Sequence, residues 1–192
     1  MVEPRVVDFG AVLAALNREL AAQDIPFMII GGQAVLLHGE PRLTQDIDIT
    51  LGIDPTGLPL ILAVCAALDL QPLPNDPEKF VSETFVLPAR PRTLGPRVDF
   101  IFSNTEYERR AIERAVKVEL GGERIPFASA EDLIIHKLFA GRPRDLEDAA
   151  SVVRGKGKSL DWKYLQRWGK HFQKIPGREM MPEQLADLKR SI

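Results

Sequence analysis

The spacing of apolar residues changes along the first fifty positions of the chain. An apolar face at helical spacing predicts a helix over Val7–Ala22, and it consists of Phe9, Val12, Leu13, Leu16 and Leu20. The fully apolar run Phe27–Ile30 is typical of a buried strand. Over Ile47–Leu51, apolar residues alternate with polar ones, and Asp46 and Asp48 fall on the polar side. This alternation predicts a second strand with an acidic face. The chain therefore begins as a helix followed by strands.

Further short segments up to residue 128 continue this mixed pattern. We expect helices over Gln33–His38, Leu58–Leu68 and Tyr107–Ala115, strands over Phe85–Leu87 and Arg97–Phe102, and a hairpin formed by Val116–Leu120 and Arg124–Phe127 around Gly121-Gly122. Proline cannot donate a backbone hydrogen bond to a sheet, so Pro126 places the second hairpin strand at a sheet edge or at a strand end.

From Ser129 onward the pattern is entirely helical. Ser129 can cap a helix that runs to about Ala140. The spacing then predicts helices over Arg144–Val153, Asp161–Lys174 and Pro182–Lys189, with a turn at Gly155–Gly157. We therefore expect an α+β core over residues 1–128 and a helical segment over residues 129–192 that packs on this core.

Composition is that of a globular protein. The chain has 192 residues, of which 45% are hydrophobic and 27% charged. Its longest uncharged apolar run, Gly57–Leu68, is far shorter than the roughly 20 residues of a membrane span. Glu3 and Asp8 stand where a signal peptide would be basic and apolar. We expect a cytoplasmic protein with no membrane partner, in which Cys65 is a core residue.

Charge is unevenly distributed. Residues 131–192 carry 13 Lys and Arg against 9 Asp and Glu, whereas the rest of the chain is acidic. Over 160–174, a basic face accompanies an apolar stripe of Leu165, Trp168 and Phe172, which we interpret as core packing. The basic face either guides an RNA backbone or is merely solvated.

The most informative stretch runs from Ile30 to Thr50. Gly31 and Gly32 follow an apolar strand and precede a helix, where free backbone N–H groups can hold a phosphate. Asp46 and Asp48 point to the same face of their strand, and two like charges held together favour a bound cation. The alternative interpretation of the pair is an edge strand with a polar outer face.

A third carboxylate, Asp99, interrupts another apolar strand. If that strand lies beside Ile47–Leu51, the three acids Asp46, Asp48 and Asp99 converge on one face of the sheet. Carboxylate oxygens suit Mg²⁺ or Mn²⁺, and three of them together with phosphates can hold two such ions for phosphoryl displacement.

These residues, in this order, resemble the motif of the nucleotidyltransferase superfamily with the DNA-polymerase-β-like fold. The later segments Arg42–Thr44, Asp132–Ala140 and Arg142–Asp148 are similar to those of AbiEii-type toxin nucleotidyltransferases and their small uncharacterised relatives. The resemblance covers roughly residues 26–153. It implies a mixed central sheet flanked by helices, and metal-dependent transfer of a nucleoside monophosphate from an NTP to an acceptor hydroxyl.

The resemblance also implies roles for individual residues. Asp46, Asp48 and Asp99 would bind Mg²⁺ or Mn²⁺ and form the catalytic group together with Asp145, which acts on the acceptor or orients Lys137. The nucleotide-binding residues would be Gly31, Gly32, Arg42, Thr44 and Lys137. From the residues themselves, Lys137 on an apolar helix must reach solvent or meet an anion. Arg42 contacts phosphate or pairs with Glu40.

Several alternatives stay open at this point. Asp148 shares a helix face with Asp145, and the simpler role of both is to pair with Arg142 or Arg144. The acceptor can be an RNA 3′ end, a protein side chain or a small molecule, and the partners include NTP and an antitoxin. A nucleotidyltransferase-fold module that binds a nucleotide or a partner without turnover is the alternative function. His38 and His136 are expected to be structural.

Overall fold

The computed structural model describes residues 8–192, and these residues form two compact units. The first unit contains residues 8–30 and Thr44–Phe127, and the second contains Gly31–Leu43 and Ala128–Ile192. Residues Gly31–Leu43 thus group with the C-terminal helices. The division of the chain into two domains at residue 128 stays a prediction. The expected helix start at Val7 and the acidic residue Glu3 lie outside the described residues.

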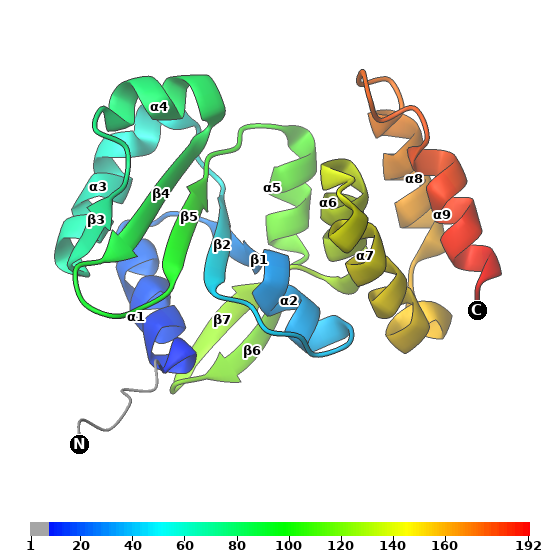
Figure 1. Ribbon diagram of the computed structural model, residues 1–192, viewed down its shortest axis with the longest axis horizontal. Coiled ribbons are helices and arrows are strands. Elements are labelled where there is room, and N and C mark those ends of the chain that lie inside the picture. The colour runs from blue at the N-terminus through cyan, green and yellow to red at the C-terminus, as the bar shows by residue number, and fades with distance from the viewer. Residues whose placement is uncertain (1–7) are drawn as a thin grey trace. The chain divides into compact units, whose positions relative to one another are not determined.

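The first unit is built on one mixed sheet of the order β3-β4-β5-β2-β1-β7-β6 (Figure 1). Its strands are β1 (Phe27–Ile30), β2 (Asp46–Leu51), β3 (Leu70–Pro72), β4 (Val86–Pro91), β5 (Arg97–Ile101), β6 (Val116–Leu120) and β7 (Glu123–Phe127). The pairs β2–β5 and β1–β7 are parallel, and the others are antiparallel. The expected α+β fold with a mixed sheet is confirmed.

Helices of the first unit pack on and around this sheet. They are α1 (Phe9–Ala22), the 3₁₀ turn Pro55–Gly57, α3 (Leu58–Ala67), α4 (Pro77–Thr84) and α5 (Glu106–Glu113). Helix α1 contacts β6, β7 and α3. The apolar residues that alternate with the acids in β2 and β5 are fully buried, as are three leucines of α1: Ile47, Ile49, Val98, Phe100, Leu13, Leu16 and Leu20. This alternation fixes the side-chain direction of the acids.

The second unit consists of helices. They are α2 (Gly31–His38), α6 (Ala130–Ala140), α7 (Pro143–Lys156), the 3₁₀ turn Gly157–Ser159, α8 (Trp162–Phe172) and α9 (Met181–Arg190). Helix α6 begins as expected, because the Ser129 side chain accepts a hydrogen bond from the Asp132 backbone N–H. The expected turn at Gly155–Gly157 is wrong in its position, because α7 continues to Lys156. The stripe Leu165, Trp168 and Phe172 is buried as expected.

Two elements have no counterpart in the sequence-based expectations. Strand β3 is only three residues long, and α4 is short with one buried residue, Val81. Phe85 was expected in a strand, but it closes α4 in the left-handed conformation, and the strand begins at Val86. The signal for α4 was present, since Asp76 is followed by Pro77, a common N-cap and first-turn pair.

No helix within residues 8–192 is long and apolar enough to cross a membrane.

Candidate active site

Three aspartates share one face of the sheet in the first unit. Strands β2 and β5 are parallel neighbours, with Asp48 paired to Asp99 and Asp46 paired to Arg97. Residues two apart on a strand point the same way, so Asp46, Asp48 and Asp99 lie on the same face. The expected convergence of the three acids on one face is therefore confirmed.

Arg97, which the sequence interpretation overlooked, lies among these acids. Its Nη2 atom is 2.7 Å from Asp99 Oδ2 and 3.6 Å from Asp46 Oδ2. The sequence did carry the signal, because Arg97 and Asp99 are two residues apart on one strand and must share a face. A guanidinium therefore partly balances the acidic face.

Of the two carboxylates that Arg97 contacts, Asp99 is less exposed to solvent than Asp46. Its side chain is 14% exposed, against 45% for Asp46. Burial raises the pKa of Asp99 above its ordinary value, although the nearby Arg97 guanidinium opposes the shift. The buried Asp99 Oδ1 has no hydrogen-bond partner among residues 8–192. This oxygen is available for a ligand.

The donor set suits a hard divalent cation. Carboxylate oxygens are the ligands that Mg²⁺ and Mn²⁺ prefer, and the unpartnered Asp99 Oδ1 is one such donor. Within the described part of the chain, no three or more His, Cys, Asp or Glu side chains are already gathered to hold a metal ion. Arg97 contacts two of the three acids. The carboxylates therefore suit a divalent cation chemically, but their side chains must draw together to coordinate it.

The start of α2 has the backbone geometry that the glycine pair suggested. Gly31 has a φ of 63°, in the left-handed region that favours glycine. The expected helix start at Gln33 is wrong by two residues, because α2 begins at Gly31 itself. Gly31 directly follows Ile30, which pairs with Asp48 across β1 and β2. Thr44, the other predicted nucleotide contact in this stretch, donates a hydrogen bond to the Asp46 carbonyl over 3.4 Å.

The second unit holds a separate ion network. Lys137 Nζ is 2.8 Å from Asp145 Oδ1 and 2.8 Å from Asp148 Oδ2. Arg42 donates two hydrogen bonds to Asp148, from Nε to Oδ1 and from Nη2 to Oδ2, each 2.8 Å long. The predicted meeting of Lys137 and Asp145 between two packed helices is confirmed.

The simpler pairings that the sequence left open as alternatives for these residues are not the ones in the structure. Arg42 pairs with Asp148 and not with Glu40, which instead accepts from Arg154 Nη2 over 2.8 Å. Asp145 and Asp148 pair with Lys137 and not with Arg142 or Arg144. The two helices α6 and α7 pack closely, so residues distant in sequence replace the local partners.

Asp145 and Asp148 differ in their remaining hydrogen-bonding capacity. Burial alone would raise the pKa of Asp148, but hydrogen bonds and charge from Arg42 and Lys137 outweigh it and hold this pKa below its ordinary value. Both Asp148 oxygens are engaged. Asp145 uses Oδ1 alone, and its buried Oδ2 has no partner within residues 8–192.

Comparison with known proteins decides the family. A model described as nucleotidyl transferase AbiEii toxin, type IV toxin–antitoxin system, matches residues 14–190, which is nearly the whole described chain. The chain belongs to the AbiEii nucleotidyltransferase family. A search of curated proteins finds no match.

Solved structures similar to this AbiEii family member are nucleotidyltransferases. The antibiotic-resistance factor ANT(2'')-Ia superposes with a TM-score of 0.57 at 12% identity, over 95% of this chain and 89% of that one. An antigenic nucleotidyltransferase-like protein from Paracoccidioides brasiliensis gives 0.53 at 17% identity, over 91% and 92%. The lincosamide antibiotic adenylyltransferase LnuA gives 0.51 at 15% identity, over 76% and 96%. At these identities the likeness establishes the nucleotidyltransferase fold.

The two histidines expected to be structural lie in the second unit, where His38 is buried and His136 is half-buried. His38 shares a hydrogen bond of 2.8 Å between its Nε2 and the Ala128 carbonyl. His136 is half-buried in α6, and desolvation of its imidazole lowers its pKa to about 4. A neutral, enclosed imidazole suits a structural role. Cys65 is buried too, and burial raises its pKa to about 12, so it remains a thiol.

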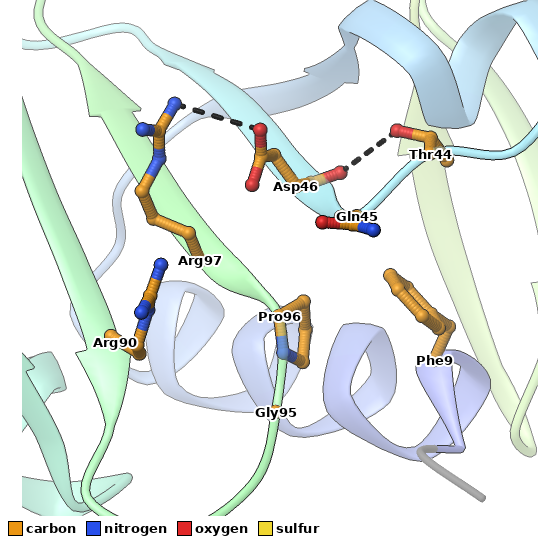
Figure 2. Close-up of a pocket in the computed structure, with 8 residues that line it drawn as sticks. All are labelled: Phe9, Thr44, Gln45, Asp46, Arg90, Gly95, Pro96 and Arg97. Carbon is orange, nitrogen blue, oxygen red and sulfur yellow. Dashed lines mark hydrogen bonds and ion pairs between the residues drawn. The ribbon is translucent and has the colours of Figure 1, made fainter.

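A pocket of about 330 Å³ opens beside Asp46 in the first unit. Figure 2 shows its lining, with Phe9 on one side and the side chains of Arg90 and Arg97 on the other. The remaining lining residues are Thr44, Gln45, Asp46, Gly95 and Pro96. The pocket therefore joins one acid of the candidate site to two cationic side chains.

Proposed function

We propose that this AbiEii family member is an enzyme that transfers a nucleoside monophosphate from an NTP to an acceptor hydroxyl and depends on Mg²⁺ or Mn²⁺. The observation that carries the proposal is the parallel pairing of β2 with β5, which aligns Asp46, Asp48 and Asp99 on one face. Family membership supports the same chemistry.

In this proposal the three aspartates hold the divalent cation. Asp46, Asp48 and Asp99 supply the carboxylate oxygens, including the unpartnered Asp99 Oδ1. When bound, the cation neutralises charge on the phosphate oxygens and on the displaced pyrophosphate.

The transfer itself makes one bond and breaks another. The acceptor oxygen bonds to the α-phosphorus of the NTP, the bond to the bridging oxygen of pyrophosphate breaks, and the hydroxyl proton leaves. Asp99 is suited to accept that proton, because burial raises its pKa and brings it closer to neutral pH.

Contacts to the triphosphate are proposed for the predicted nucleotide-binding residues. These are Gly31, Gly32, Arg42, Thr44 and Lys137. Lys137 would exchange Asp145 for phosphate oxygens, since both are ion-pair acceptors for the same ammonium. Asp145 is then the better candidate than Asp148 to act on the acceptor, because its Oδ2 has no partner in the described chain, whereas Arg42 and Lys137 occupy both Asp148 oxygens.

The direct test is transfer of label. The protein is incubated with each NTP labelled at the α-phosphate, with Mg²⁺ and a cell extract, and label is sought in RNA, protein and small molecules. Label in one of these fractions supports the proposal and names the acceptor class. NTP binding without any transfer, in Mg²⁺ or in Mn²⁺, would contradict it and favour a nucleotide-binding module.

The biological role proposed is that of a toxin held in check by an antitoxin protein, which the family description suggests. A cytoplasmic location, where NTPs are available, is part of this proposal. Growth arrest on expression of the parent and not of Asp46→Asn would support a toxin whose effect depends on transfer. Equal growth with both proteins would contradict it.

A further inference from the structure

Two arginines face each other at the pocket beside the acids. The antiparallel register of β4 and β5 pairs Ala89 with Val98, which places Arg90 opposite Arg97 one step further along. Both side chains line the pocket of about 330 Å³ (Figure 2). Like charges directly opposite on paired strands are destabilising, and here Asp46 and Asp99 partly balance Arg97. The strand pairing therefore builds a cationic site next to Asp46.

The two arginines differ in their engagement. Arg97 is shared between Asp99 at 2.7 Å and Asp46 at 3.6 Å. Arg90 is exposed and forms no ion pair with any residue of the described chain. Arg92, which directly follows the end of β4 at Pro91, pairs instead with Asp69 over 3.1 Å. Arg90 therefore lines the pocket with a guanidinium that forms no ion pair within residues 8–192.

Arg97 also competes with any cation bound by the acids. A divalent cation held by Asp46 and Asp99 would face the Arg97 guanidinium at close range, and like charges repel. Arg97 must turn away from the acids before the cation binds fully. The neighbouring pocket is the space that it already lines and into which it can turn.

We propose that this pocket is an oxyanion-binding site in which Arg90 and Arg97 hold a phosphate-like group, and that the bound anion draws Arg97 away from Asp46 and Asp99. Anion and divalent cation then bind cooperatively, because the anion removes the competitor of the cation. Guanidinium groups are well suited to bidentate contacts with such oxyanions. The proposal rests on the cation assignment made under the proposed function.

The test measures Mn²⁺ affinity by electron paramagnetic resonance, in sodium chloride and in sodium sulfate of equal ionic strength. We expect the parent to bind Mn²⁺ roughly fivefold more tightly in sulfate, at the lower end of coupling between two sites. Linkage requires Mn²⁺ to strengthen sulfate binding by the same factor. Glycerol phosphate in a parallel series distinguishes a phosphate monoester from a free inorganic anion as the natural occupant.

Three variants separate the two arginines. Arg90→Ala should bind Mn²⁺ like the parent in chloride but lose the gain in sulfate. Arg97→Gln should bind Mn²⁺ more tightly than the parent in chloride, with no further gain in sulfate. Arg92→Ala removes a cation that lies just beyond the end of β4 and outside the pocket lining, and it should behave like the parent.

Equal Mn²⁺ affinity of the parent in chloride, sulfate and glycerol phosphate would overturn the cooperative site while leaving the metal assignment intact. A gain in sulfate that survives in Arg90→Ala would show a general salt effect and overturn it as well. No Mn²⁺ binding by the parent under any condition would overturn both this inference and the metal dependence in the proposed function.

Discussion

Two ion clusters, one in each unit, shift the pKa of an aspartate in opposite directions. Burial raises the pKa of Asp99 on the sheet, whereas two cations hold the pKa of Asp148 between the helices below its ordinary value. Arg97 reaches Asp99 and Asp46 at unequal distances of 2.7 and 3.6 Å. Arg42 and Lys137 each reach Asp148 at 2.8 Å.

The difference between Asp99 and Asp148 is that one carboxylate keeps an oxygen open to a ligand and the other has both oxygens bound. Asp148 has both oxygens occupied, so its network stabilises the packing of the second unit. Asp99 retains a buried oxygen without a partner in the described chain, which is costly unless a ligand fills the need. Asp145 resembles Asp99 in this respect, because its buried Oδ2 also has no partner in the described chain, whereas its neighbour Asp148 has both oxygens bound.

The largest effect is expected at the acid face. Asp46→Asn should lower transfer about 10³-fold, because it removes a charge that holds the cation. The metal-free protein should melt no lower than the parent, since the change relieves repulsion among like charges. Transfer activity is measured with Mg²⁺, and melting temperature is measured without metal, for the variant and the unmodified protein. Asp69→Asn, which changes an exposed acid, serves as the control. A large fall in melting temperature would make Asp46 a structural residue.

The second expectation concerns the network between α6 and α7. Lys137→Ala leaves the buried Asp145 without its cation and Asp148 with Arg42 alone, and it should cost roughly 3–5 kcal/mol of unfolding free energy in urea. The double variant Lys137→Met, Asp145→Asn should cost less, because Asp148 keeps Arg42. Equal losses in the two proteins would show that charge balance does not hold this network together.

The same lysine tests the proposed triphosphate contact. Calorimetric titration should show weaker NTP binding by Lys137→Ala, whereas Asp145→Ala should bind NTP and chiefly transfer more slowly. Both variants are measured well below their melting temperatures, so that binding is not confounded by unfolding. If Lys137→Ala binds NTP as tightly as the parent, Lys137 is only an ion-pair partner.

A third expectation follows from His136, which lies beside Lys137 in α6. Its pKa falls from 6.5 to about 4 on burial, so the unfolded chain takes up a proton in this range that the folded chain resists. Unfolding free energy should therefore decline as pH is lowered from 6.5 to 4, by about 3 kcal/mol from this group. The decline should be smaller in His136→Leu, where His38, whose pKa is also lowered, still contributes. An unchanged slope would contradict the burial effect.

The smallest expected effect is at the start of α6. Ser129→Ala removes the hydrogen bond to the Asp132 backbone N–H and should cost about 1 kcal/mol in urea unfolding. Ser129→Thr, which can still cap, should cost less. A similar loss in both variants would mean that packing and not the cap determines the stability at this helix start.

Much of the acid face could be predicted from the sequence, because strand alternation alone fixes it. Side chains alternate between the two faces of a strand, so Asp46 and Asp48 share one face. The apolar residues Ile47 and Ile49 between and after them point to the other face, which is buried. The parallel pairing with β5, which brings Asp99 alongside Asp48, depends on distant contacts and was only a condition of the prediction.

The ion partners were less predictable. Arg42 meets Asp148 across 106 positions of sequence, whereas the sequence offered only a phosphate or the nearby Glu40 as its partner. Short elements with little burial, such as β3 and α4, carry weak apolar patterns and were overlooked. Arg97 was overlooked for another reason, because its strand was examined only for acids.

A crystal structure of the protein with Mn²⁺ and a non-hydrolysable NTP tests the central claim most directly. We predict anomalous density at ligand distance, roughly 2.1 Å, from carboxylate oxygens of Asp46, Asp48 and Asp99, with Arg97 turned away from them. Bound nucleotide with no Mn²⁺ at these carboxylates, and with Arg97 still paired to Asp99, would contradict it.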